Sequence, residues 1–390
     1  MAGRPERPAP HGWAARVPGH AVRAEAGRRG CTLRCLRGGS GARRARGHPL
    51  RKDGEPRRSL RRGLLPGRGA GRRRRVRAPA EYGRHDLTGR RYLITGASTG
   101  LGFFTARSLV GRGAEVVITG RSATRLAAAA AGTGRPDLTA TLPFDIAELS
   151  EVDGAARTLL EGQNGGGGFD GVVLNAGVVH PPADRETTSD GVERVFATNV
   201  LGHFALLSRL TAEAALRESA AIVWLGSIAP ALTRAHLQDV QLRGGYSSWN
   251  AYAQSKLATQ VLAIEGDRRA RAAGGHVRSL VAHPGYSTGG LTPTVAGVHE
   301  PSLGKRALDG LLAVAAQGKD DGALCQLRAV TDPELCGGET IVPARLTRGR
   351  PVLGTSHWRS YDSELGERLW DYCASLAGAA PDFSAISART

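Results

Sequence analysis

The sequence of 390 residues has no run of 18 apolar residues, so it predicts no membrane-spanning helix. Cysteine is also scarce. The five cysteines are odd in number and lack metal-ligand spacing: Cys31, Cys35, Cys325, Cys336 and Cys373. These shortages exclude a disulfide-stapled fold, and no metal site is expected. A reduced protein of the cytoplasm is expected instead.

Acidic residues are nearly absent from positions 1–80, which hold 23 lysines and arginines against four aspartates and glutamates. The whole chain carries a formal net charge of +18, with 53 basic and 35 acidic residues. Positions 81–390 therefore hold 30 basic and 31 acidic residues and are close to neutral. The chain is predicted to consist of a basic segment joined to a neutral body.

The basic segment, residues 1–82, is rich in Arg, Gly and Pro and lacks any sustained apolar period. Such a composition cannot bury enough surface to offset chain entropy, so disorder is predicted. Three interpretations stay open: an arm that binds nucleic acid or acidic lipid, a targeting peptide, and translation upstream of the native start in a GC-rich gene. The last is favoured, because ordered motifs begin only near residue 90, and no nucleic-acid partner is expected.

The body alternates short apolar runs with helical patterns. The runs predict strands at 92–96, 115–120, 139–145, 169–177, 220–227 and 276–285, and the helical patterns lie at 98–114, 122–132, 148–161, 191–217 and 249–271. This alternation indicates βαβ units and a Rossmann-like, doubly wound parallel sheet flanked by helices. A single α/β domain is predicted over residues 83–380, followed by a C-terminal tail at 381–390.

Ligands of such sheets bind at the carboxyl ends of the strands, where the first strand is followed by TGASTGLG at 95–102. In this loop the first glycine allows a tight turn, the second lets the backbone approach a pyrophosphate, and the third permits close packing of helix on sheet. The following helix offers N–H groups and a positive dipole end to phosphates. Cofactor contacts are expected from Gly96, Ser98, Thr99, Gly100, Leu101 and Gly102.

The ends of the next three strands refine this dinucleotide site. Arg121 follows the second strand, where an NAD-selective site would have an acidic residue, and its guanidinium suits a 2′-phosphate. NADP(H) is therefore predicted as the preferred cofactor, with NAD(H) as the alternative. Asp145 and Ile146 follow the third strand and are assigned to the cofactor; the Asp145 carboxylate could accept from the adenine amino group or cap the next helix. After the fourth strand, Asn175, Ala176 and Gly177 are assigned to the cofactor, and Asn175 could tie neighbouring strands together.

The fifth strand and the helix after it carry the candidate catalytic residues. Ser227 ends the strand, and Tyr252 and Lys256 share one face of the helix. A nearby ammonium lowers the pKa of a phenol and makes it usable as an acid or base near neutral pH. Ser227 could donate a hydrogen bond to a substrate oxygen that gains negative charge. Asn199, in the predicted long helix, could hold a water that relays protons to Lys256.

In this order, TGASTGLG, NAG at 175–177, Asn199, Ser227, YAQSK at 252–256 and HPG at 283–285 resemble the short-chain dehydrogenase/reductase family over residues 88–375. The 25-residue gap from Ser227 to Tyr252 is similar to that of its retinol-dehydrogenase-like and protochlorophyllide-reductase-like branch. The resemblance implies NAD(P)-dependent interconversion of a carbonyl and an alcohol. It implies Tyr252 as proton donor or acceptor, Lys256 on the nicotinamide ribose, and Pro284, Gly285 and Ser287 near the nicotinamide.

Two further functional hypotheses remain beside the oxidoreductase. One is a regulator that binds NADP without turnover, although such proteins usually lack the tyrosine or the lysine, and both are present. The other is nucleic-acid binding through the basic arm. The expected partner of the enzyme is a small, fairly apolar carbonyl or alcohol, and relatives often pair as homodimers or homotetramers through the two long helices.

Overall fold

A computed structural model describes residues 85–162, 168–233 and 235–387, all within one compact unit, Arg77–Thr390. The predictions for residues 1–82, including the nucleic-acid arm, lie outside the described residues. In the described part of the chain, no helix is both long and apolar enough to cross a membrane. The same residues contain no group of three or more His, Cys, Asp or Glu side chains placed to hold a metal ion.

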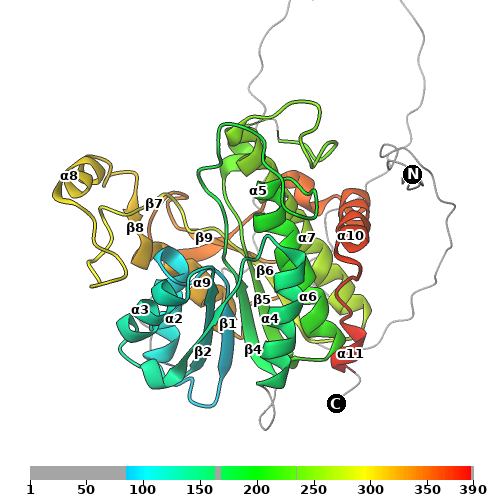
Figure 1. The fold of residues 1–390 in the computed structure, drawn as a ribbon, viewed down its shortest axis with the longest axis horizontal. Helices are drawn as coiled ribbons and strands as arrows, with labels where there is room; N and C mark the ends of the chain where they lie inside the picture. Colours follow the sequence, from blue (N-terminus) through cyan, green and yellow to red (C-terminus); the bar gives the residue numbers. More distant parts are fainter. Residues whose placement is uncertain (1–84, 163–167, 234, 388–390) are drawn as a thin grey trace, which may run out of the picture. The chain divides into compact units, whose positions relative to one another are not determined.

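An eight-stranded sheet forms the centre of the described chain (Figure 1), with strand order β10-β9-β6-β5-β4-β1-β2-β3. The strands are β1 (Arg91–Ile94), β2 (Glu115–Gly120), β3 (Thr139–Pro143), β4 (Phe169–Leu174), β5 (Leu216–Leu225), β6 (Arg278–Ala282), β9 (Thr340–Pro343) and β10 (Pro351–Gly354). All neighbours pair in parallel except β9 and β10. The predicted Rossmann-like sheet is confirmed, and its order reverses between β1 and β4, where such sheets bind ligands.

Helices cover both faces of the sheet. One face is covered by α2 (Gly100–Val110), α3 (Ala123–Gly132) and α9 (Lys319–Thr331), and the other by α4 (Leu149–Glu161), α6 (Gly202–Ala212) and α7 (Ser248–Ala272). Helix α10 (Ser363–Ala377) packs over α6 and α7. Because both faces are covered, the central strands are continuous apolar runs, and every residue of β4 is buried.

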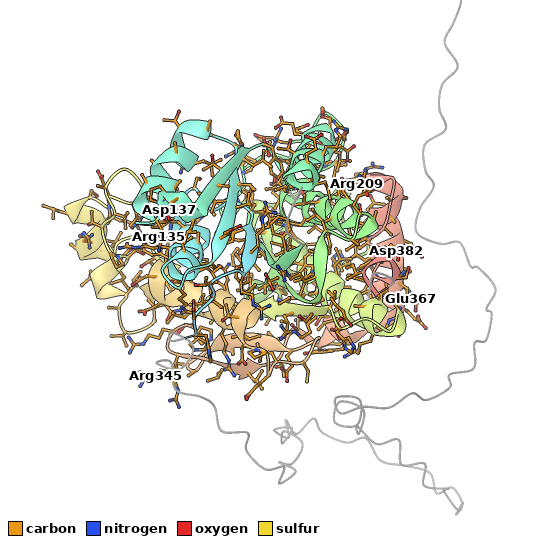
Figure 2. All side chains as sticks on the ribbon, turned by 90° about the horizontal axis from the view of Figure 1, so that it is seen from below. Arg135, Asp137, Arg209, Arg345, Glu367 and Asp382 are labelled. Carbon is orange, nitrogen blue, oxygen red and sulfur yellow. The ribbon has the colours of Figure 1, made fainter. Side chains whose placement is uncertain are left out.

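The C-terminal segment packs against α6. Arg209 of α6 donates to the Ala377 carbonyl at 3.0 Å, and the Asp382 N–H donates to Thr211 at 2.9 Å; Figure 2 shows Arg209 and Asp382 on the same side of the molecule. Phe383 and Ile386 are buried, the latter in α11 (Ser384–Ser387). The packed body therefore continues into the predicted tail at 381–390.

The predicted helix at 191–217 is wrong in detail. The structure has α5 (Arg194–Phe196), a π-helical turn η2 (Ala197–Leu201) and then α6, which ends at Ala212. Ala214 has a positive φ of 46°, and the Ala215 N–H donates a hydrogen bond to the Leu210 carbonyl, so the helix ends here. Strand β5 then begins at Leu216, inside the range predicted as helix, because residues 211–215 contain no glycine or proline that would mark the end of the helix.

The segment between β6 and α9 had no predicted structure. It contains β7 (Ser287–Thr288), α8 (Leu303–Leu311) and β8 (Gln317–Gly318), and β7 pairs with β8 in a separate two-stranded sheet. Short 3-10 turns lie elsewhere at η1 (Pro136–Leu138), η3 (Ala229–Leu232) and η4 (Trp358–Tyr361). Figure 1 shows α8 at the outer side of the molecule, beyond β7 and β8. Its leucines are exposed, in contrast to the buried helices on the sheet.

Candidate active site

Two of the three glycines in the loop between β1 and α2 have no room for a side chain, whereas the third lies beside open space. Gly96 and Gly100 have φ angles of 64° and 66°, a region that favours glycine. A Cβ on Gly96 would lie 2.7 Å from Ala176 Cα, and one on Gly102 would lie 2.5 Å from Asn175 Nδ2. At Gly100 the same position has no neighbour closer than 3.7 Å. The loop therefore packs against β4 at its ends and leaves its middle open, which fits the diphosphate of a dinucleotide.

A buried amide network fixes this loop at the sheet's switch point. Asn175 Nδ2 donates to the carbonyls of Thr95 at 2.8 Å and Gly96 at 3.1 Å. Asn175 Oδ1 accepts from Gln326 Nε2 at 2.9 Å, and Gln326 Oε1 accepts from Thr105 at 2.7 Å. Asn175 thus ties β1 to β4, as expected, and a glutamine of α9 orients its amide.

Thr95 organises the opposite side of the same point. Its hydroxyl oxygen accepts from the N–H groups of Asn175 at 2.9 Å and Ala176 at 3.0 Å. His203 Nδ1 lies 3.3 Å from the Asn199 carbonyl, which can only accept, so Nδ1 carries the proton. Nε2 therefore accepts the Thr95 hydroxyl proton at 2.8 Å. Burial lowers the pKa of His203 to about 3, so this ring stays neutral.

Asn199 lies in the π-helical turn η2 and is buried. Its Oδ1 accepts from the Val178 N–H at 2.7 Å, and its Nδ2 donates to Ser255 of α7 at 2.8 Å. The side chain therefore joins the end of β4 to the helix that carries Tyr252 and Lys256. Turns of this kind inside helices are frequent at functional sites.

Tyr252, Ser227 and Lys256 meet at the carboxyl end of β5. The Tyr252 hydroxyl lies 3.4 Å from Ser227 Oγ. Lys256 Nζ donates to the Leu225 carbonyl at 2.7 Å, and it lies 3.7 Å from the place a Cβ would take on Gly177. The ammonium is thus buried between the ends of β4 and β5.

The pKa values of the pair differ from the expectation in one respect. Burial lowers the pKa of Lys256 to about 8. Burial also raises the pKa of Tyr252, and the bond to Ser227 offsets this only in part. The predicted lowering of the tyrosine pKa is therefore wrong for this chain, because burial disfavours the phenolate and Lys256 directs a proton to a backbone carbonyl.

On the side of β2 and β3, Arg121 is exposed directly after β2. Its side chain has no hydrogen bond or ion pair within the described residues. Ser98 of the glycine loop lies 3.6 Å from the Cβ position of Gly120, so the loop and the end of β2 are adjacent. Ser122 caps α3 by accepting from the Arg125 N–H at 3.3 Å. Arg121 thus follows a residue that contacts Ser98 and directly precedes the cap of α3.

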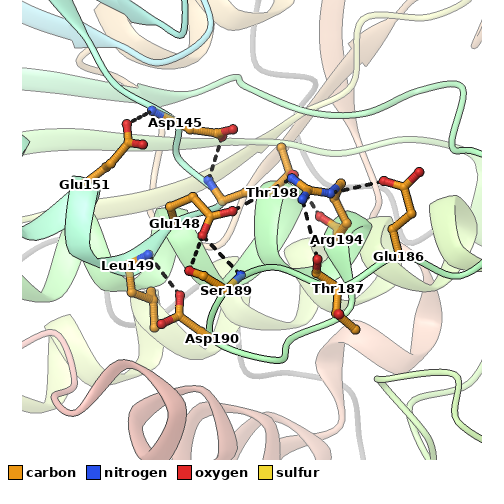
Figure 3. A network of polar contacts seen from close by, with 11 residues as sticks. Asp145, Glu148, Leu149, Glu151, Glu186, Thr187, Ser189, Asp190, Arg194 and Thr198 are labelled. Carbon is orange, nitrogen blue, oxygen red and sulfur yellow. Dashed lines mark hydrogen bonds and ion pairs between the residues drawn. The ribbon is translucent and has the colours of Figure 1, made fainter.

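Figure 3 shows the polar network beside Asp145. Asp145 Oδ1 accepts from the Ala147 N–H at 3.0 Å, and the cap of α4 is Glu148 rather than Asp145. Glu148 accepts from Ser189, and Arg194 of α5 lies 3.2 Å from Glu186. The network therefore fastens the 186–190 loop to the start of α4. Ile146 is buried, and its carbonyl lies where a Cβ on Gly202 would be.

After β6, Gly285 has a φ of 71°, and a Cβ there would overlap the Thr347 carbonyl. The Pro284 carbonyl accepts from Ser287 Oγ at 2.9 Å and from Gln317 Nε2 at 2.8 Å. The Ser287 hydroxyl therefore already donates its hydrogen bond within its own turn. The arginine-rich loop between β9 and β10 anchors this segment, since the Tyr286 N–H donates to the Thr347 carbonyl at 2.7 Å.

Large apolar side chains stand around this edge of the sheet. They follow β4, β5 and β6 or begin α7, and each is half or more exposed: Val179, Leu232, Trp249 and Tyr286. The rings of Trp249 and Tyr252 lie 6.0 Å apart. Exposed apolar side chains therefore lie at the edge that carries the catalytic candidates.

The structure brings together all four catalytic candidates and the predicted cofactor residues at the carboxyl ends of β1, β2, β3, β4, β5 and β6. Sequence reasoning missed the residues that hold them: Thr95, His203, Gln326 and Gln260. Gln260 Nε2 donates to the Ser227 carbonyl at 2.7 Å, and its Oε1 accepts from the His357 N–H at 2.8 Å. The spacing of TNVLGHF at 198–204 was the available signal for His203, one helical turn after Asn199.

The chain is similar to known proteins in sequence and fold. The family model of the short chain dehydrogenases matches residues 90–296. Polyprenol dehydrogenase of Mus musculus is 34% identical over 302 residues, which cover 75% of this chain and 84% of that protein. Retinol dehydrogenase 11 of Mus musculus is 31% identical, over 76% and 89%. A solved structure of an uncharacterised Mycobacterium paratuberculosis protein has a TM-score of 0.60 at 32% identity, covering 76% and 96%.

Proposed function

The chain belongs to the short chain dehydrogenase family and is an oxidoreductase that uses a nicotinamide dinucleotide, and from this premise we propose that it interconverts an apolar carbonyl and its alcohol with NADP(H), Tyr252 serving as the general acid or base. The observation that carries the proposal is the approach of the Tyr252 hydroxyl to Ser227 at 3.4 Å, with the buried Lys256 one helical turn away.

In the direction of reduction, NADPH supplies the hydride when bound. The hydroxyls of Ser227 and Tyr252 hold the carbonyl oxygen, and Tyr252 gives its proton to that oxygen as negative charge grows there. Its raised pKa keeps the phenol protonated before the step. Lys256 lies one helical turn away, and because burial lowers its pKa to about 8 it can supply the proton that restores the phenol near neutral pH.

Two positions support the choice of cofactor. Arg121 follows β2 without a carboxylate partner in the described chain, and the Ser122-capped N-terminus of α3 lies beside it. Both favour an added negative charge on the adenosine ribose. NAD(H) lacks this phosphate, so it gains nothing from the arginine.

The apolar edge supports the class of substrate. Val179, Leu232, Trp249 and Tyr286 offer hydrocarbon surface around the reacting hydroxyls. The two relatives are named for apolar alcohols, a polyprenol and retinol. A substrate with an alkyl, aryl or isoprenoid body fits this surface better than a charged one.

The test measures NADPH consumption by the full chain over a panel of aldehydes, ketones and quinones, with Tyr252→Phe in parallel. Turnover should fall by about 10²–10⁴-fold in the variant while the Kd for NADPH stays within twofold. Arg121→Ala should weaken NADPH by about tenfold and leave NADH unchanged. If NADPH binds but neither carbonyls nor alcohols turn over, the chain is a cofactor-sensing regulator instead.

A further inference from the structure

A lysine from outside the glycine loop lies over its open centre. Lys319 is the first residue of α9, and its Cδ and Nζ lie 3.7 and 3.8 Å from the Cβ position of Gly100. No other side chain or non-neighbouring backbone of the described chain comes within 4 Å of that position. The space beside Gly100 that could hold a diphosphate is therefore bounded on its other side by the Lys319 ammonium.

The backbone of Lys319 is fixed in relation to the loop. Its N–H donates to Thr292 Oγ1 at 2.8 Å. One turn later, a Cβ on Gly322 would lie 2.9 Å from Leu101 Cδ2, so α9 and the glycine loop are in contact. Packing of α9 therefore fixes the backbone of Lys319 beside the glycine loop.

The charge of Lys319 is not neutralised by the described chain. The side chain is half-buried, and this burial lowers its pKa. It forms no ion pair within the described residues, and the nearby Asp309 is paired with Lys305 at 2.6 Å. Asp320 folds back toward Gly318. A partly desolvated cation without an anion is unfavourable, which favours an anionic ligand at this place.

We propose that Lys319 closes the diphosphate site from the side opposite the glycine loop, as a direct charge contact to the diphosphate of the dinucleotide. The inference rests on the proposed function. The residue type supports it: four of the 53 basic residues are lysine, namely Lys52, Lys256, Lys305 and Lys319. A lysine ammonium binds phosphate oxygens as a compact point charge.

The test measures Kd for NADPH and for NADH from their fluorescence in the full chain, without any turnover. Lys319→Met should weaken both dinucleotides by a similar factor of about ten, because both contain the diphosphate. Lys319→Arg should retain most of the affinity for both. Arg121→Ala should weaken NADPH alone. Arg135→Met, which removes an exposed cation paired with Asp137, is the control for net charge and should change neither Kd.

The outcomes separate the two proposals. If the native chain binds both dinucleotides and Lys319→Met binds them equally well, Lys319 has no role in the site and the proposed function stands. A loss for NADPH but not NADH would place Lys319 at the 2′-phosphate and overturn the diphosphate contact. If the native chain binds neither dinucleotide, both proposals fail. The midpoint of thermal unfolding of Lys319→Met should lie at or slightly above the native value, since the substitution removes a partly desolvated cation that makes no described ion pair.

Discussion

Two neighbouring regions at the carboxyl edge of the sheet are built in opposite ways. Between β1, β4 and β5, the polar residues Thr95, Asn175, Asn199 and Lys256 are all buried and hydrogen-bonded. In the segment 286–318, the apolar side chains of Leu303, Leu311 and Val314 are instead exposed by 85%, 82% and 85%. The first region buries its polar side chains, whereas the second exposes large apolar side chains to solvent.

This difference indicates which parts of the enzyme are held in one conformation. A buried polar network whose amide and hydroxyl groups are hydrogen-bonded has one low-energy arrangement, so it holds the loop, the π-helical turn and the catalytic helix in register. The 286–318 segment is anchored at its base, but α8 buries little and can accept changes at small cost. We infer that the reaction type resides in the first region, and that the second contributes to the choice of substrate together with the exposed side chains of Val179, Leu232 and Trp249.

The largest difference in the free energy of unfolding should appear when one glycine is replaced by alanine in each of the two regions. Gly202→Ala would place a Cβ on the Ile146 carbonyl and should lower the free energy of unfolding by about 3–5 kcal/mol. Gly310→Ala in α8 meets nothing within 4 Å and should raise it by up to about 1 kcal/mol through helix propensity. Urea unfolding of both variants checks this, and equal effects would refute the contrast.

A smaller loss is expected when the network loses one hydroxyl. Thr95→Val leaves the N–H groups of Asn175 and Ala176 and the ring nitrogen of His203 without their partner, and should cost about 2–4 kcal/mol. Thr95→Ser keeps the hydroxyl and should cost about 1 kcal/mol. Urea unfolding measures both. A serine variant as unstable as the valine variant would mean that packing of the methyl group, and not the hydroxyl, matters here.

The smallest effect should have the opposite sign, because Lys256 is the buried charge of the network. Its folded pKa of about 8 lies below the ordinary value of 10.5, so the unfolded chain binds more protons between these pH values. The penalty is full below pH 8 and fades as the pH rises to 10.5. Lys256→Met should therefore stabilise the fold by roughly 1–3 kcal/mol at pH 7, and less at pH 9.5, while abolishing turnover.

Urea unfolding at both pH values tests this. The Leu225 carbonyl loses its donor in the methionine variant, which places the expected gain at the low end of the range. A methionine variant less stable than the native chain at pH 7, or a difference that does not shrink with pH, would show that the ammonium is not penalised by burial.

The local sequence was sufficient to predict features that depend only on a residue's own backbone conformation or on its position within one helix. The positive φ angles of Gly96 and Gly100 follow from the TGASTGLG loop, and the shared face of Tyr252 and Lys256 follows from a spacing of four. The sequence could not predict the end of α6 at Ala212, because the stretch from Thr211 to Ala215 lacks glycine and proline. Nor could it predict the pKa of Tyr252, which depends on what surrounds the ring.

By itself, the sequence determined the parallel sheet, the glycine loop and the identity of the four catalytic candidates, because these depend on periodicity and on short spacings along one element. Only the tertiary structure decided their supports. Gln326 reaches Asn175 across 151 positions, His203 reaches Thr95 across 108, and Lys319 lies beside Gly100 although 219 positions separate them (319 − 100). Such contacts are set by how helices pack on opposite faces of one sheet, which no local pattern encodes.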